Sequence, residues 1–150
     1  MVTRTPAPSP ARGWLIAAGL LSTGIALLHL AIIAAGPRAY AYFGAPQLAP
    51  MAARGSPVPA LMTAGLALLF AIWAWYAFAG AGLAARPPLL TLGLWVIGAV
   101  FTARGLVLVP ELVALGRDSA SVPPRFAVFS SVSLATGVAY LAGAWLRRRA

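Results

Sequence analysis

Residues 13–35 read GWLIAAGLLSTGIALLHLAIIAA, an apolar stretch without a charged side chain. A run of about 18 or more apolar residues with few charges is typical of a transmembrane helix. Three similar runs follow, at about 58–80, 88–110 and 124–146. Each is near the roughly 20 residues that a helix needs to cross a bilayer core at about 1.5 Å per residue. The sequence therefore predicts four membrane spans.

The fold class follows from the lipid that surrounds the spans. In lipid only helices and closed β-barrels satisfy the backbone, and these runs lack the alternating pattern of barrel strands. We therefore predict an all-α polytopic membrane protein, a four-transmembrane-helix bundle with both termini on the same side. An alternative for the first run is a secretory signal peptide, since AYA at 39–41 resembles a cleavage site. The run exceeds the usual apolar core of about 7–15 residues, so we interpret it as a retained span.

Composition excludes a water-soluble domain. The chain has 150 residues, of which 61% are hydrophobic and 9% charged, and its mean hydropathy is +0.89. Soluble domains are about 45–50% apolar and about 25% charged. We expect three regions: a disordered or interfacial N-terminal tail at 1–12, the four-helix transmembrane domain at 13–146, and a basic C-terminal tail at 147–150.

The charge pattern indicates membrane topology and lipid contact. The net charge is +9, but no basic stripe with interleaved aromatic residues exists, so nucleic acid is not an expected partner. The arginines flank the spans, where they act as topology signals and contact anionic headgroups. The side of the termini carries Arg4, Arg12, Arg86, Arg147, Arg148 and Arg149, and the other side carries Arg38, Arg54, Arg117 and Arg125 with the acids Glu111 and Asp118. The positive-inside rule then predicts cytoplasmic termini.

The connections between spans differ in length. Residues 80–87, GAGLAARP, predict a tight turn. Residues 36–57 form a longer connection whose Tyr40, Tyr42 and Phe43 suit the headgroup layer. Residues 111–123 form another long connection and hold both acids.

Polar residues inside the spans define the candidate site. Arg104 lies six residues before the end of its run and His29 six residues before the end of its own. Both runs cross in the same direction, so the two residues are expected at one depth, roughly 9 Å below the outer boundary. Further polar residues of the four runs fall near this layer: Thr63, Thr102, Ser130, Ser131 and Ser133. We predict a ligand-binding layer around Arg104 and His29, with Glu111 as a further partner.

Two interpretations of Arg104 stand side by side. Its head can snorkel to the headgroups, or it can face the bundle interior and pair there, as intramembrane arginines usually do. Because helical side chains tilt toward the helix N-terminus, snorkelling to the nearer surface works against that tilt. For His29 the alternatives are an interhelical hydrogen bond and a ligand-binding or proton-transfer role. With one histidine and no cysteine, neither a metal site nor a cofactor is expected. Haem would need an axial ligand from a second chain.

Small residues recur at every fourth position on two spans. On the fourth span they are Ala127, Ser131, Ala135, Ala139 and Gly143, and on the first they are Ala18, Ser22 and Ala26. Such stripes let helix backbones approach closely. They favour a compact bundle.

A resemblance covers roughly residues 25–110. The stretches HLAIIAAGPRAYAYFGAP and WYAFAGAGLAARPPLLTLGLWVIGAVFTARGL resemble a group of small four-helix bacterial membrane proteins of unassigned function. The motif elements are His29, Gly36-Pro37, Tyr42-Phe43-Gly44, the glycine-alanine run at 79–82, and Arg104-Gly105. The resemblance implies the four-span layout and no activity.

Three classes of function remain open at this point. The first is a non-enzymatic structural or accessory component that packs with itself or with a larger membrane complex. The second is binding or transport of a lipid or small anion at Arg104. The third is a membrane enzyme that uses His29 as acid or base. No nucleophile elbow, phosphate-binding loop or paired carboxylate is present, and no catalytic residue is predicted.

Overall fold

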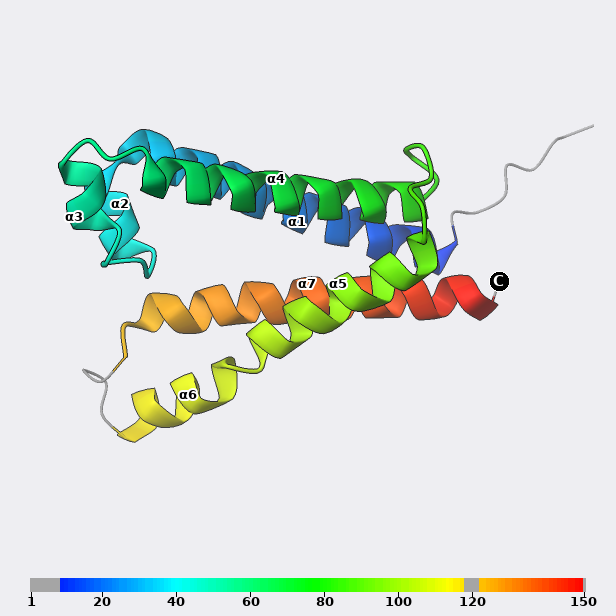
Figure 1. The fold of residues 1–150 in the computed structure, drawn as a ribbon. Helices are drawn as coiled ribbons and strands as arrows, with labels where there is room; N and C mark the ends of the chain where they lie inside the picture. The colour runs from blue at the N-terminus through cyan, green and yellow to red at the C-terminus, as the bar shows by residue number, and fades with distance from the viewer. Residues whose placement is uncertain (1–8, 118–121, 150) are drawn as a thin grey trace, which may run out of the picture. The chain divides into compact units, whose positions relative to one another are not determined.

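The computed structural model describes residues 9–117 and 122–149, and these residues are all-α, as predicted. Four helical segments are long and apolar enough to cross a membrane: Pro10–Ala35, Val58–Gly80, Leu90–Arg117 and Pro124–Arg149. The chain is therefore an integral membrane protein with four spans. Its helices are α1 (Pro10–Ala35), α2 (Pro37–Tyr42), α3 (Ala49–Ala53), α4 (Val58–Gly80), α5 (Leu90–Gly105), α6 (Leu108–Arg117) and α7 (Pro124–Arg149) (Figure 1).

The helix ends follow the proline pattern closely at two spans. Helix α4 has the predicted bounds, and α7 begins at Pro124 as expected. Proline suits the first turn of a helix because its missing N–H has no partner to lose there. Helix α1 begins at Pro10, before the predicted start, and α7 continues through Arg149. The predicted N-terminal tail lies largely outside the described residues.

The third span differs from the prediction at its outer end. We expected a helix that ends at Pro110 and a connection at 111–123, but the helix breaks earlier and then resumes as α6 through Arg117. Pro110 has no N–H to donate to the Leu106 carbonyl, and in a continuous helix its ring would clash with that carbonyl. The N–H of Val109 donates to the Leu106 oxygen instead, at 3.1 Å. Pro110 therefore lies in the first turn of a new helix and does not end the old one.

The chain forms two compact units. The smaller one, the 22–74 unit, contains the second part of α1, the helices α2 and α3, and most of α4. The larger one, the α5–α7 unit, contains the described residues 9–21, 75–117 and 122–149. It includes the start of α1 and the end of α4.

All four spans meet in the α5–α7 unit around Gly80, at the end of α4. A Cβ atom placed there would lie 3.0 Å from Leu15 of α1, 3.1 Å from Leu94 of α5 and 3.2 Å from Arg147 of α7. Leu15 is fully buried and also lies against Gly143 of α7, where an added Cβ would approach its Cγ to 2.5 Å. Small residues thus let the helices approach closely at this end of the spans.

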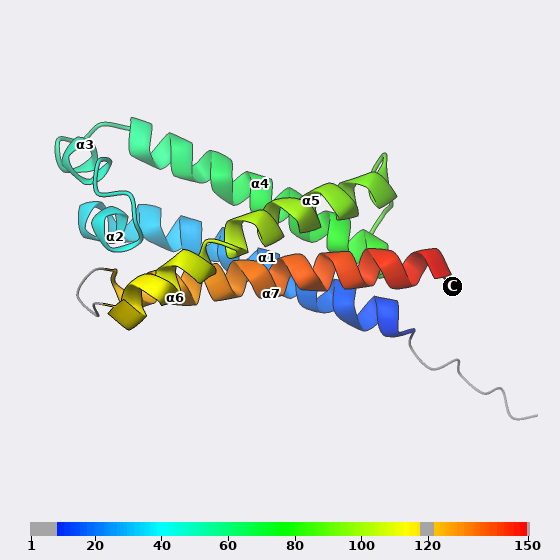
Figure 2. The same ribbon diagram turned by 90° about the horizontal axis from the view of Figure 1, so that it is seen from below.

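Helices α5 and α7 pack against each other (Figures 1 and 2), and α6 also contacts α7, although it diverges from α7 in Figure 1. Their close contacts follow an antiparallel register in which steps of four and three residues along α5 match equal steps back along α7. Such steps are the heptad spacing of packed helices. The pairs are Gly98 with Leu141, Thr102 with Gly137, and Gly105 with Leu134.

The small-residue stripe of α7 coincides with its buried face only in part. Of the expected small residues, Ser131 and Ala135 are exposed, whereas Ala139 and Gly143 are buried. The stripe of close contact includes Leu134, so residue size alone did not identify the contacting face. On α1 the predicted residues Ala18, Ser22 and Ala26 are all buried.

The turn between α4 and α5 is tight, as predicted. Gly82, at φ +76°, ends α4 in the left-handed conformation that favours glycine. The N–H of Leu83 donates to the Phe78 carbonyl at 2.8 Å, and that of Gly82 to the Ala79 carbonyl at 3.1 Å. This is the Schellman pattern, which satisfies the last carbonyls of a helix. Side chains of α4 also hold the turn: the Trp75 indole N–H donates to Ala85 and the Tyr76 hydroxyl to Pro88.

The 22–74 unit contains the long connection between the first two spans. Gly36, at φ +75°, separates α1 from α2, and proline at position 37 starts the new helix. Tyr42 is exposed and packs edge-on against Phe43. Tyr40 is buried, and its hydroxyl has no hydrogen-bond partner among the described residues. The expected headgroup position therefore suits Tyr42 better than Tyr40.

Candidate functional site

Arg104 lies in the last turn of α5 and contacts α7 directly. Its Nη1 donates a hydrogen bond to the Ser130 hydroxyl at 2.9 Å. Ser130 is fully buried, whereas the Arg104 side chain as a whole is exposed. The arginine therefore reaches along the outside of α5 to a buried acceptor on the neighbouring helix. We call this contact the Arg104–Ser130 bond.

The backbone geometry beside this bond is set by glycine. At Gly105 an added Cβ atom would lie 2.5 Å from the Leu134 backbone, so a larger residue cannot occupy this position without moving a helix. Thr102, one turn earlier on α5, lies against Gly137. Its Oγ1 is buried and has no hydrogen-bond partner among the described residues. Arg104 thus lies beside a close approach of α5 and α7.

The other two serines near Ser130 on α7 form hydrogen bonds within their own helix. Ser131 donates to the Ala127 carbonyl at 2.8 Å and Ser133 to the Phe129 carbonyl at 3.0 Å. Such bonds to the carbonyl four residues earlier satisfy a hydroxyl in an apolar setting. Of the two predicted site serines, the structure brings Ser130 to Arg104, and it leaves Ser131 exposed.

Glu111 lies in the first turn of α6. Within the parts of the chain that are described, no ion pair joins it to Arg104, and its Oε2 is enclosed without a hydrogen-bond partner. The helix break before α6 changes the helix direction between the two residues (Figure 1). Seven residues of continuous helix would have placed them on one face.

His29 and Thr63 belong to the 22–74 unit. His29 Nδ1 lies 2.8 Å from the Ile25 carbonyl oxygen, which only accepts, so Nδ1 is the donor in this hydrogen bond. The imidazole ring packs on Phe70 of α4 at 5.0 Å between ring centroids. Thr63 lies on α4 and is buried. Because Arg104 belongs to the α5–α7 unit, the layer that combines it with these residues stays a prediction.

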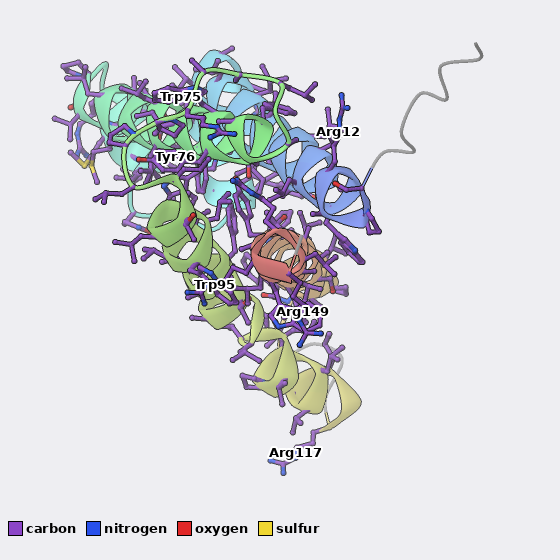
Figure 3. All side chains as sticks on the ribbon, turned by 90° about the vertical axis from the view of Figure 1, so that its right-hand side faces the viewer. Arg12, Trp75, Tyr76, Trp95, Arg117 and Arg149 are labelled. Atoms are coloured by element: carbon purple, nitrogen blue, oxygen red, sulfur yellow. The ribbon has the colours of Figure 1, made fainter. Side chains whose placement is uncertain are left out.

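A second polar cluster lies in the α5–α7 unit, at the end of the spans where α1 begins and α7 ends. An open groove of about 570 Å³ is lined by three arginines and a tryptophan, Arg86, Arg147, Arg148 and Trp95, together with Pro87, Leu89, Leu90, Thr91 and Leu92. Arg148 lies over the Trp95 ring at 5.9 Å. Figure 3 looks onto this end of α7, with Trp95 and Arg149 beside its last turns. We call this cluster the basic groove.

In the sequence these arginines are interpreted as topology signals and as contacts for anionic headgroups. Arg86 and Arg147 are predicted on one side of the membrane, and this is the signal that could have identified the groove. The side-by-side packing of α5 and α7 brings them together with Trp95, and that packing is not readable from spacing.

The site can supply cationic and hydroxyl groups. Within the residues that the structure describes, no group of three or more His, Cys, Asp and Glu side chains could hold a metal ion. Fold and site define the class of protein, a four-span integral membrane protein with arginines at both ends of its α5–α7 pair. No protein-family model, curated protein or solved structure matches the chain. The resemblance to small four-helix bacterial membrane proteins stays a hypothesis.

Proposed function

We propose that this chain is a non-enzymatic structural or accessory component of the membrane, which packs with itself or with a larger membrane complex. The observation that carries the proposal is the Arg104–Ser130 bond. The most unusual charged residue of the spans is used there to join two helices.

Three other polar side chains of the spans support the same function. His29 bonds to its own helix, and so do Ser131 and Ser133. Polar groups in lipid are costly unless they have partners, and such internal bonds satisfy them. A reaction centre needs polar groups that stay available to a substrate, whereas these groups contribute to packing.

The test is native mass spectrometry of gently solubilised protein. We expect the wild-type chain to appear as a defined oligomer or with a partner protein. We expect Arg104→Ala to lower the thermal midpoint of unfolding without changing the bound small molecules. A wild-type monomer that carries a lipid or anion, together with loss of that ligand in Arg104→Ala, would contradict the proposal.

Binding of a lipid or small anion at Arg104 is a second candidate. It is favoured by the exposure of the Arg104 side chain, since one of its five donors meets Ser130 and the residue remains open to its surroundings. Arg104→Lys distinguishes the two functions, because lysine keeps the charge but cannot reproduce the planar guanidinium. Retained ligand with a lowered thermal midpoint of unfolding supports the structural function. Lost ligand with an unchanged thermal midpoint supports anion binding.

We further propose that the protein lies in a bacterial inner membrane with its termini in the cytoplasm. The support is the arginine count, six on the side of the termini against four on the other, and the resemblance of residues 25–110. The chain has no cysteine, so single cysteines report topology without background. Ala85→Cys should be shielded from a membrane-impermeant thiol reagent in intact cells, and Ala53→Cys should react. Labelling of Ala85→Cys together with protection of Ala53→Cys would show that the termini lie outside the cytoplasm.

A further inference from the structure

We propose that the basic groove of the α5–α7 unit is a binding site for the phosphate headgroup of an anionic phospholipid in the leaflet on the side of the termini. The proposal goes beyond the function proposed above. It depends on none of the residues of the Arg104–Ser130 bond.

The charges of the groove come from two segments that are far apart in the sequence. Arg86 lies in the turn before α5, while Arg147 and Arg148 lie in the last turn of α7, and all three line the groove. Among the described residues, no carboxylate lines it. Guanidinium groups bind phosphate through paired, charge-assisted hydrogen bonds. Three of them around one groove match a phosphate group of an anionic lipid.

Two N–H groups of the lining residues have no hydrogen-bond partner among the described residues, namely Arg147 Nη1 and Trp95 Nε1. Both atoms are enclosed, and an enclosed donor without an acceptor costs free energy. The Arg147 head lies against the last turn of α4, near Gly80, where the negative end of the helix dipole favours a cation. Arg147 is thus held at the wall of the groove, while Arg86 and Arg148 remain exposed.

The rim of the groove is apolar and lies at the start of a span. Leu89 is 74% exposed and Leu92 is 57% exposed, so acyl chains can lie along them. Leu89 has φ +53°, a left-handed conformation that is unfavourable for leucine. Such strained positions often occur at binding sites. A headgroup on the arginines with its chains along these leucines would occupy both parts, and this distinguishes a phospholipid from a free phosphate ion.

The experiment titrates the detergent-solubilised full chain with phosphatidylglycerol, and separately with phosphatidylcholine of the same acyl chains, and counts bound lipid by native mass spectrometry. The test variant is Arg86→Gln/Arg148→Gln, which changes exposed residues and leaves the packed Arg147 in place. We expect it to weaken phosphatidylglycerol binding by about tenfold or more and to leave phosphatidylcholine binding unchanged.

The matched control is Arg149→Gln. Arg149 belongs to the same turn of α7 but does not line the groove, and its head lies 3.6 Å from the Trp145 ring centroid. We expect this variant to change phosphatidylglycerol binding by less than about twofold. An equal loss in both variants would overturn the proposal, because it would show diffuse attraction to surface charge. Displacement of the lipid by millimolar inorganic phosphate would also overturn it, in favour of a free-anion site.

Discussion

At the residue scale, glycine decides where α5 and α7 touch. Gly105 faces the backbone of Leu134, and Gly137 faces Thr102. Association of helices in lipid depends on packing and hydrogen bonds, since burial of apolar surface gains little there. Close backbone approach is therefore a main source of stability for this pair of spans.

We predict that Gly105→Ala destabilises the protein by about 1–3 kcal/mol, because the new methyl group meets backbone atoms that cannot turn aside. The control is Gly65→Ala on α4, where an added Cβ meets nothing within 4 Å. Alanine is the better helix residue, so Gly65→Ala should be neutral or stabilising by about 0.5–1 kcal/mol. Thermal unfolding in one detergent measures both. Equal midpoints for the two variants would contradict this view of Gly105.

At the residue level the sequence singles out Arg104 as a candidate but does not identify its hydrogen-bond partner. An arginine inside an apolar run can be recognised from the sequence as a residue with a special role, because its guanidinium stays charged and needs an acceptor. Three serines are predicted near the depth of Arg104, and helix spacing does not determine which of them faces α5. The choice of Ser130 depends on the register of α5 against α7, which is a tertiary property.

At the element scale, the third span shows how proline is misread. Proline after an apolar run was interpreted as a helix end, yet it is equally favourable in the first turn of a new helix. Pro110 does the latter, and the helix continues to Arg117. Length and hydropathy predicted the spans well because they depend on the bilayer thickness. They contain no information on a break within a span.

We predict that Pro110→Ala joins α5 and α6 into one helix, because residue 110 regains an N–H for the Leu106 carbonyl. Spin labels at Val96→Cys and Gly116→Cys should then move apart, since a straight helix is longer than a bent one. Pulsed electron spin resonance measures the change. An unchanged distance distribution would show that packing of α6 on α7 sets the bend.

At the scale of the whole molecule, the four-span count was predictable and the joint layer of His29 with Arg104 remains a prediction. Hydropathy determines how many helices cross, and parity then sets the termini on one side. The layer requires in addition that the outer parts of the first and third spans lie at one depth. That inference used rise per residue alone.

We predict that cysteines beside the two residues, Leu30→Cys and Ala103→Cys, carry spin labels within about two helix spacings of 8–10 Å. The control pair, Leu30→Cys with Leu92→Cys, moves the second label eleven residues back along α5 and should give a clearly longer distance. All three positions are exposed, so the labels leave the packing intact. Similar distances for both pairs would contradict the prediction that His29 and Arg104 lie in one layer.

The most direct test of the structural function is a double-mutant cycle on Arg104→Gln and Ser130→Ala, read as free energy of unfolding in a fixed detergent. If the Arg104–Ser130 bond holds α5 to α7, the two effects are non-additive by about 0.5–2 kcal/mol. The same cycle with Ser131→Ala, whose hydroxyl bonds within α7, should be additive. Additive effects of Arg104→Gln and Ser130→Ala would contradict a helix-joining role for this arginine.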